Sequence, residues 1–190
     1  MGYGQFSTRS TKGSVLLAVP LLDEPTFHRT VVYMMQHDED GALGVVLNRP
    51  TDEDSLPGLD SWMLELSHPQ VVFEGGPVES STLIAVAALA HDAESDAYAL
   101  LADGLGTVDL AKLPSDVAEG LRNLRVFRGY AGWGPGQLDD ELEEGSWLVL
   151  DCDINDVFSR NPRDLWRNLL RRHGGHKALL ADAPDDLHWN

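Results

Sequence analysis

Cysteines and long apolar runs are both scarce in this sequence. The one cysteine, Cys152, leaves no partner for a disulfide within the chain, which is typical of proteins from a reducing compartment. No apolar run approaches the roughly 20 residues that a membrane-spanning helix needs. The stretch 15–22 resembles the apolar part of a signal peptide, but it contains Pro20 and continues into Asp23 without a small-residue cleavage site. We therefore expect a cytoplasmic protein without a membrane partner.

Basic residues are also few. The chain has 14 Lys and Arg against 31 Asp and Glu, so its formal net charge is -17. A nucleic-acid-binding domain needs a basic face to displace counterions from phosphates, and this composition disfavours one. Four arginines do gather near the C-terminus: Arg163, Arg167, Arg171 and Arg172. We interpret them as the solvated face of a helix, and direct binding of nucleic acid is disfavoured.

The sequence lacks the spacing of a metal site. Its seven histidines are scattered, and two glycines separate His173 from His176. The stretch HDEDG at 37–41 resembles a calcium loop, but Gln36 and Leu47 would then occupy the two anchoring positions that need carboxylates. A hairpin turn explains it better, and we expect no metal.

Signatures of covalent or cofactor chemistry are missing as well. Neither HExxH nor the GxSxG nucleophile elbow occurs. Cys152 lies between Asp151 and Asp153, and two neighbouring carboxylates disfavour the reactive thiolate. We expect an inert thiol, no cofactor and no catalytic centre.

The length of 190 residues fits one domain. Residues 1–13 are polar and rich in Gly, Ser and Thr, so we expect a flexible N-terminal segment before a single domain at 14–175. Residues 176–190 are expected to be a partly ordered tail. Predicted strands outnumber helices and do not alternate with them, which favours an α+β fold with a β-rich core and a few packed helices.

The clearest local prediction is a hairpin. Strands at 30–36 and 42–48 are joined by an Asp-Gly turn, a sequence that favours tight hairpin loops. The other expected strands are 14–19, 71–73, 124–130 and 147–150, and the expected helices are 60–67, 114–123, 137–144 and one that begins at Pro162. Residues 81–89 are ambiguous between strand and helix. We favour a strand there, because the turn before it suggests another hairpin.

Residues 127–148 hold the most distinctive stretch, a strand followed by a glycine-rich turn, a short helix and a second strand. Free N–H groups at a helix start attract anions. The glycine spacing fits neither the dinucleotide fingerprint nor the P-loop, and Asp139 and Asp140 at the helix start would repel a phosphate. We favour a tight turn with Tyr130 and Trp133 packed into the core.

An alternative for the same turn is a docking site for a small molecule or protein, lined by Tyr130, Trp133 and Gln137. Polar residues at the strand ends add to this surface: Arg29, His37, Asn48, Arg49 and Glu74, with Gly75 and Gly76 beside them. One hypothesis is that they all face a common cleft with the glycine turn. The other is that Asn48 satisfies turn backbone and Arg49 pairs with a surface acid.

Three stretches together resemble the YqgE/AlgH family. They are SVLLAVPLLDEPTFHRTVVYMMQHDEDGALGVVLNRP, FEGGPVE and FRGYAGWGPGQLDDELEEGSWLV, and the pair Leu165-Trp166 also matches. The resemblance covers most of residues 13–172 in order. It implies a single α+β domain whose mixed sheet rolls towards a pseudo-barrel with helices outside, in a bacterial cytosolic protein.

The resemblance implies no particular reaction. The family is often labelled a transcriptional regulator because of a link to exopolysaccharide control, but no DNA-reading motif accompanies that label here. Our leading hypothesis is a non-enzymatic binding or regulatory domain that acts through a protein or small-molecule partner. One alternative is a hydrolase-like enzyme that uses His37 and Glu74 as acid–base groups near Arg29. Direct DNA regulation is a second alternative, disfavoured by the charge.

Overall fold

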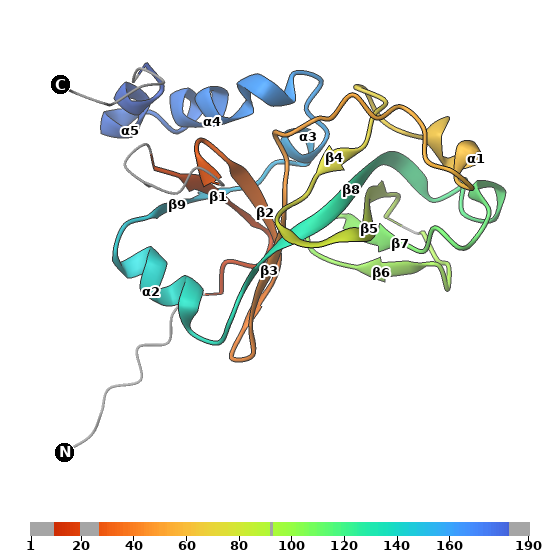
Figure 1. Cartoon of the computed structure of the whole chain (residues 1–190), viewed down its shortest axis with the longest axis horizontal. Helices are drawn as coiled ribbons and strands as arrows, with labels where there is room; N and C mark the ends of the chain where they lie inside the picture. Colours follow the sequence, from red (N-terminus) through yellow and green to blue (C-terminus); the bar gives the residue numbers. More distant parts are fainter. Residues whose placement is uncertain (1–9, 20–26, 92, 183–190) are drawn as a thin grey trace.

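A single curled sheet organises the molecule (Figure 1). The computed structural model describes residues 10–19, 27–91 and 93–182. Its strands are β1 (Ser14–Ala18), β2 (Val31–Asp38), β3 (Gly41–Val46), β4 (Phe73–Glu74), β5 (Val78–Leu89), β6 (Tyr98–Leu100), β7 (Leu105–Val108), β8 (Leu121–Trp133) and β9 (Trp147–Asp151). Their order is β6-β7-β5-β8-β3-β2-β1-β9, and β4 pairs with β8 in parallel. The predicted α+β fold with a mixed, β-rich core is confirmed.

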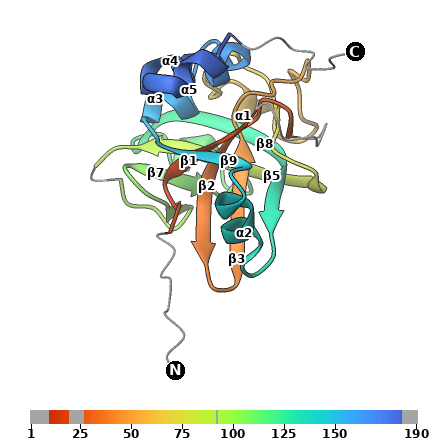
Figure 2. The ribbon, with the colours of Figure 1, turned by 90° about the vertical axis from the view of Figure 1, so that its left-hand side faces the viewer.

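Short helices surround this sheet. They are α1 (Asp60–Met63), α2 (Gln137–Glu143), α3 (Ile154–Val157), α4 (Leu165–His173) and α5 (Gly175–Leu180), with 3-10 turns η2 (Pro114–Asp116) and η3 (Pro162–Asp164). Figure 2 shows α3, α4 and α5 grouped at one end of the molecule and α2 beside the β2–β3 hairpin. Within the described ranges, every helix is too short or too polar to cross a bilayer.

The β8 strand joins the two parts of the sheet. One edge of β8 pairs with β5 along most of its length. The other edge pairs with β4 at Phe127 and with β3 at Trp133. The turn at Gly75 and Gly76 therefore carries the chain from one edge of β8 to the other. A Cβ on Gly76 would lie 2.2 Å from the carbonyl carbon of Tyr130, so only glycine allows this close crossing.

The predicted hairpin is confirmed, and so is the strand at 81–89. β2 and β3 pair with His37 opposite Ala42, and Gly41 has a φ of +131°. The reason given for the strand at 81–89 was wrong, because β5 forms no hairpin with the preceding β4. β5 pairs with β7 and β8 instead.

Two predicted helices are much shorter in the structure. The helix expected at 60–67 is one turn, and its N-cap is Leu59 without a side-chain hydrogen bond. The helix expected at 114–123 is only the 3-10 turn η2, because residues from Leu121 onward pair with β5. Strand pairing thus outweighs the local helical pattern at these residues. The helix at the glycine turn does form, and Gly145 follows its C-cap with a φ of +78°.

The C-terminal helix packs as its pattern predicts. The inward residues Leu165, Trp166, Leu169 and Leu170 are all buried in the largest hydrophobic cluster. The Trp166 indole N–H also donates to the carbonyl oxygen of Ala18 at 2.9 Å. Asn161 precedes η3 and makes no side-chain cap bond to it. The expected tail begins with α5, and our predictions for 1–9, 20–26 and 183–190 lie outside the described residues.

Candidate functional site

The candidate residues fall into two separate groups. The first group lies where β2 begins and β3 ends, or at the adjoining β4 and β8. It consists of Arg29, Asn48, Arg49, Glu74, Gly75, Gly76 and Tyr130. His37, Trp133 and Gln137 lie at the tip of the β2–β3 hairpin. Val31 and His37 stand at opposite ends of β2, about 20 Å apart at the rise of an extended strand. A common cleft for all of these residues is therefore ruled out.

Asn48 holds the backbone of the first group. Its Nδ2 donates to the carbonyl oxygen of Arg29 at 2.8 Å, and its Oδ1 accepts from the N–H of Val31 at 2.9 Å. Arg29 has a φ of +51°, so these bonds stabilise a left-handed residue at the strand entry. The Arg29 guanidinium lies 5.1 Å from the Trp166 ring centre. Burial, and then the charge of Arg167, lower its pKa.

Arg49 and Glu74 form a loose pair on the surface. Arg49 Nη1 lies 3.9 Å from Glu74 Oε1, and the Glu74 side chain is 60% exposed. The N–H of Glu74 also donates to the carbonyl oxygen of Arg49 at 2.9 Å. These contacts match the hypothesis in which Asn48 satisfies backbone and Arg49 meets a surface acid.

The hairpin-tip group is held together by one carboxylate. Glu141 Oε2 accepts from the indole N–H groups of Trp133 and Trp147, each at 2.8 Å. The Gln137 amide donates to Glu141 Oε1 at 2.9 Å, and its own Oε1 accepts from the N–H of Gly134. Trp133 is 7% exposed. The polar atoms of Trp133 and Gln137 that the docking alternative would use are therefore already bonded within the chain.

His37 contacts Thr11 and Asp139. Its Nδ1 lies 3.2 Å from the Thr11 main-chain N and 3.0 Å from the Thr11 hydroxyl, and its Nε2 lies 3.5 Å from Asp139 Oδ1. A hydroxyl, an imidazole and a carboxylate in this order resemble a hydrolase triad. However, Thr11 is 4% exposed, and its main-chain N–H already donates to the Nδ1 that a base would use. The contacts hold residues 10–13 against the sheet.

The enzymatic alternative needed His37 and Glu74 within hydrogen-bond reach of one substrate. His37 lies at the hairpin tip, whereas Glu74 pairs with Arg128 on β8 beside Arg49. The structure thus separates the two proposed acid–base groups, so they do not meet the distance requirement of this alternative. Across the part of the chain that the structure describes, no group of three or more His, Cys, Asp or Glu side chains could hold a metal ion.

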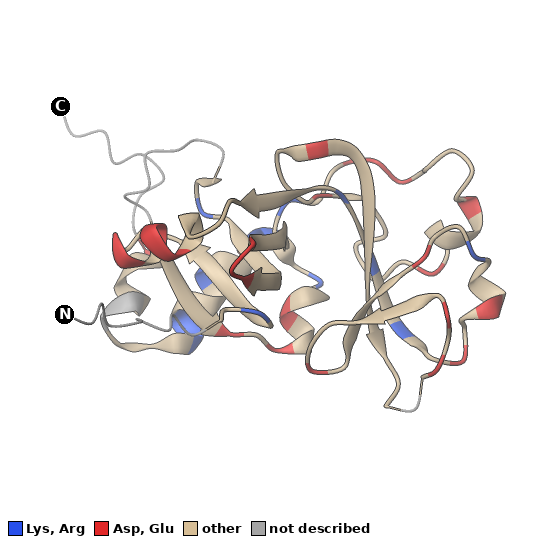
Figure 3. Cartoon of the chain, turned by 90° about the horizontal axis from the view of Figure 1, so that it is seen from below, with Lys and Arg blue, Asp and Glu red and all other residues tan. Residues whose placement is uncertain are grey.

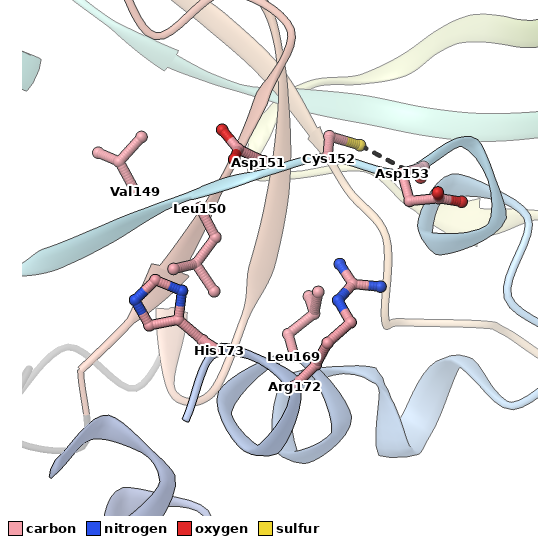
Figure 4. Close-up of a pocket in the computed structure, with 8 residues that line it drawn as sticks. All are labelled: Val149, Leu150, Asp151, Cys152, Asp153, Leu169, Arg172 and His173. Atoms are coloured by element: carbon pink, nitrogen blue, oxygen red, sulfur yellow. Dashed lines mark hydrogen bonds between the residues drawn. The ribbon is translucent and has the colours of Figure 1, made fainter. Parts of the chain in front are cut away.

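Acidic residues outnumber basic ones and are spread over many loops and helices (Figure 3). A pocket of about 460 Å³ lies between β9 and α4 (Figure 4). Its wall includes Cys152, whose pKa is raised to about 12 by burial first and then by Asp156 and Asp153. The thiol therefore stays neutral at neutral pH, with burial as the larger cause and the neighbouring acids as the smaller one.

A second groove, of about 430 Å³, includes Pro50, the residue that follows Arg49. Its walls are Pro50, Thr51, Asp52, Pro69 and Val71 on one side and Arg160, Asn161, Pro162, Arg163 and Asp164 on the other. Arg160 and Arg163 are exposed. Neither makes a hydrogen bond or ion pair with any residue that the structure describes. The groove thus holds two available guanidinium groups in a strongly acidic protein.

Arg125 on β8 forms hydrogen bonds with residues that precede two groove-lining segments. It is 1% exposed and donates to the carbonyl oxygens of Val157, His68 and Ser159 at 2.7, 2.9 and 3.1 Å. Its guanidinium also lies 4.2 Å from the Phe73 ring centre. Burial lowers its pKa to about 10, so it remains protonated at neutral pH. His68 precedes Pro69 in one wall, and Ser159 precedes Arg160 in the other.

Sequence reasoning missed Arg125, Glu141 and Arg160, and it interpreted Arg163 only as part of a solvated helix face. Arg125 interrupts the apolar run 124–127, and this break in a predicted strand was the available signal. Each buried tryptophan needs an acceptor for its N–H, but the sequence does not show that Glu141 supplies it to two of them. Only the structure shows that Arg160 and Arg163 line the same groove.

Comparison with known proteins gives consistent matches. A family model described as AlgH-like covers residues 15–178. The UPF0301 protein of Streptomyces avermitilis is 44% identical over 191 residues, which cover 98% of this chain and 99% of the relative. The UPF0301 protein of Thermobifida fusca is 42% identical over 186 residues, covering 93% and 94% of the two chains.

Two solved structures share the fold. The crystal structure of a protein from Corynebacterium diphtheriae matches with a TM-score of 0.85 at 27% identity, over 96% of this chain and 95% of that one. The solution structure of the AlgH protein from Pseudomonas aeruginosa matches with a TM-score of 0.66 at 25% identity, over 96% and 98%. The resemblance noted in the sequence is confirmed, and this chain belongs to the AlgH-like family.

Proposed function

We propose that this protein is a non-enzymatic binding domain that docks an anionic group of a small-molecule or protein partner in the groove between residues 50–71 and 160–164. The proposal rests on one observation. Arg160 and Arg163 line the groove without an acidic partner in the described chain. Guanidinium groups recognise carboxylates and phosphates through paired, charge-assisted hydrogen bonds.

The groove is built as a rigid site. Pro50, Pro69 and Pro162 contribute to its walls, and proline restricts the backbone before any ligand arrives. Arg125 bonds to main-chain carbonyls next to both walls. A preorganised site loses less entropy when it binds a partner, which supports recognition over a purely structural role.

The groove also limits what its ligand can be. Asp52 and Asp164 line it together with the arginines. A dense polyanion would meet these carboxylates as well as the general repulsion of a chain with net charge -17. The suited ligand carries one anionic group flanked by hydrogen-bond donors, as an amino acid or a peptide C-terminus near a basic side chain does. Duplex DNA fits this description poorly, so a regulatory effect would act through such a partner.

Thermal shift with single-anion probes tests this proposal. L-glutamine, L-arginine, inorganic phosphate and a capped peptide bearing one glutamate are titrated against the full chain. A probe that binds the folded state at about 100 times its Kd adds about 2.7 kcal/mol. That corresponds to a rise in Tm of roughly 5–10 °C for a domain of this size.

The double variant Arg160→Ala/Arg163→Ala should lose that shift while its Tm without ligand stays unchanged, because both side chains are exposed. Arg122→Ala is the matched control, since it removes an exposed arginine elsewhere on the surface. The proposal fails if no anionic probe raises the Tm. It also fails if the control variant weakens binding as much as the groove variant.

A further inference from the structure

None of the strands that the structure describes lies beside the outer edge of β9. Within residues 10–19, 27–91 and 93–182, β9 ends the strand order of the sheet, and its one partner there is β1. The N–H of Val19 donates to the carbonyl oxygen of Ser146 at 3.1 Å, which fixes the alternation of the ladder. Leu148 and Leu150 therefore bond to β1, and the main-chain N–H and C=O groups of Val149 and Asp151 point outward.

This edge has no lysine, proline or β-bulge to block further pairing. Natural edges carry lysine, proline or a β-bulge that blocks further pairing. β9 reads WLVLD, and its register with β1 runs without interruption. The Val149 side chain is 40% exposed, so an apolar residue stands in the middle of the free edge. The edge remains competent to pair with another strand.

A groove runs along the same edge. The pocket of about 460 Å³ is lined on one side by Val149 to Asp153 and on the other by Leu169, Arg172 and His173 of α4. Figure 4 shows Leu169, Arg172 and His173 directed from α4 towards β9. An added strand would thus bond to the β9 backbone and rest against the end of α4.

The charges beside this edge favour a partner segment with a basic side chain. Arg172, the arginine in the lining, is already held by Asp156, with Nη1–Oδ1 and Nη2–Oδ2 distances of 2.8 and 2.6 Å. Asp153 caps α3 through its bond to the N–H of Asn155. The exposed Asp151 makes no such contact with the residues that the structure describes. Its carboxylate is available to a cation on an incoming strand.

We propose that β9 is a strand-addition site for an extended segment of a partner protein, with an apolar residue beside Val149 and a Lys or Arg beside Asp151. Main-chain hydrogen bonds give such complexes their affinity, and alternate side chains give their specificity. A second copy of this chain suits the edge less well, because each copy carries a net charge of -17. This surface is separate from the groove between residues 50–71 and 160–164, so the two proposals stand or fall independently.

The test uses the capped probe peptide Thr-Lys-Val-Thr-Val-Lys-Thr and amide hydrogen exchange followed by NMR. Binding should slow exchange at Val149 and Asp151 about ten-fold or more, because their N–H groups gain partners. Exchange at Leu148 and Leu150 should stay unchanged, since β1 already holds them. The matched control is the same peptide with N-methyl groups on alternate residues, which removes the donors that face β9.

Two variants sharpen the outcome. Val149→Lys places a protecting charge on the edge and should abolish binding without lowering the Tm, and Asp151→Asn should weaken binding about ten-fold at low salt. Equal binding of the N-methylated peptide overturns the proposal, as does slowed exchange at sites away from β9. No binding of the probe also overturns it. A dimer in light scattering that Val149→Lys dissociates would assign the edge to a second copy instead.

Discussion

Tyr33 and Arg125 are buried polar side chains in different electrostatic surroundings. Burial raises the pKa of Tyr33, with Cys152 and Asp103 adding to the effect. The Tyr33 hydroxyl is also buried, and it has no hydrogen-bond partner among the residues that the structure describes. Arg125, by contrast, places its charge among main-chain carbonyls. A lysine at this position would not replace these hydrogen bonds, because its ammonium group does not reproduce the planar arrangement of donors in a guanidinium group.

Cys152 gives the stability of this protein a specific pH dependence. Its folded pKa of about 12 exceeds the ordinary value of 9.0, so the unfolded chain releases the thiol proton first as pH rises. The stability associated with the neutral thiol is complete below pH 9 and is lost as pH rises towards 12. From about pH 8 to about pH 9.5 the free energy of unfolding should fall by about 1 kcal/mol.

Urea denaturation under reducing conditions measures this loss at the two pH values. Cys152→Ala should remove most of the difference, since alanine carries no titrating group. Tyr33→Phe is the comparison variant and should retain the loss, because the Tyr33 hydroxyl ionises only at higher pH. An unchanged pH dependence in Cys152→Ala would contradict the assignment to this thiol.

At the scale of elements, glycines decide where strands can cross. Gly76 carries the chain past β8, and its Cβ position lies 2.2 Å from the carbonyl carbon of Tyr130. Gly136 is the N-cap residue before α2, with a φ of +73°, and it has nothing within 4 Å of its Cβ position. The two glycines therefore separate the effect of a steric clash from that of a left-handed backbone.

Gly76→Ala should lower the free energy of unfolding by roughly 3–5 kcal/mol, because backbone atoms of β8 must move to admit the methyl group. Gly136→Ala should cost only about 1–2 kcal/mol, the strain of a left-handed alanine. Urea denaturation compares both variants with the parent chain. Similar losses in the two variants would show that the crossing at Gly76 is not tightly packed.

Elements with a local cause were predictable. The β2–β3 hairpin followed from its Asp-Gly turn, and the buried stripe of α4 followed from its apolar spacing. The helix expected at 114–123 was wrong because residues from Leu121 onward pair with β5, a strand more than thirty residues earlier at Leu89. A local pattern contains no information about a pairing partner so distant in the chain.

The whole molecule carries an excess of negative charge. Ion pairs such as Arg128 with Glu53, at 2.7 Å, neutralise individual carboxylates, and the net charge is -17 after all 14 basic residues are counted. Repulsion among exposed carboxylates destabilises the compact state. Salt screens this repulsion, because the Debye length falls below the spacing of surface charges.

Raising NaCl from about 20 mM to about 300 mM should raise the Tm by roughly 2–4 °C, the equivalent of about 1 kcal/mol. Differential scanning calorimetry measures the change. The variant Asp140→Asn/Glu143→Gln/Glu144→Gln removes three exposed carboxylates from α2 and the residue that follows it, and its response to salt should be smaller. A Tm that falls with salt would mean that ion pairs outweigh the repulsion.

The sequence by itself determined the family, the α+β class and the hairpin, because motifs and strand turns act over a few residues. Only the tertiary structure decided that His37 and Glu74 lie apart, that Glu141 bonds to both Trp133 and Trp147, and that β9 ends the sheet. These features depend on contacts such as the one between Trp166 and Ala18, 148 residues apart. Such contacts form only when the whole chain has folded and buried its apolar surface.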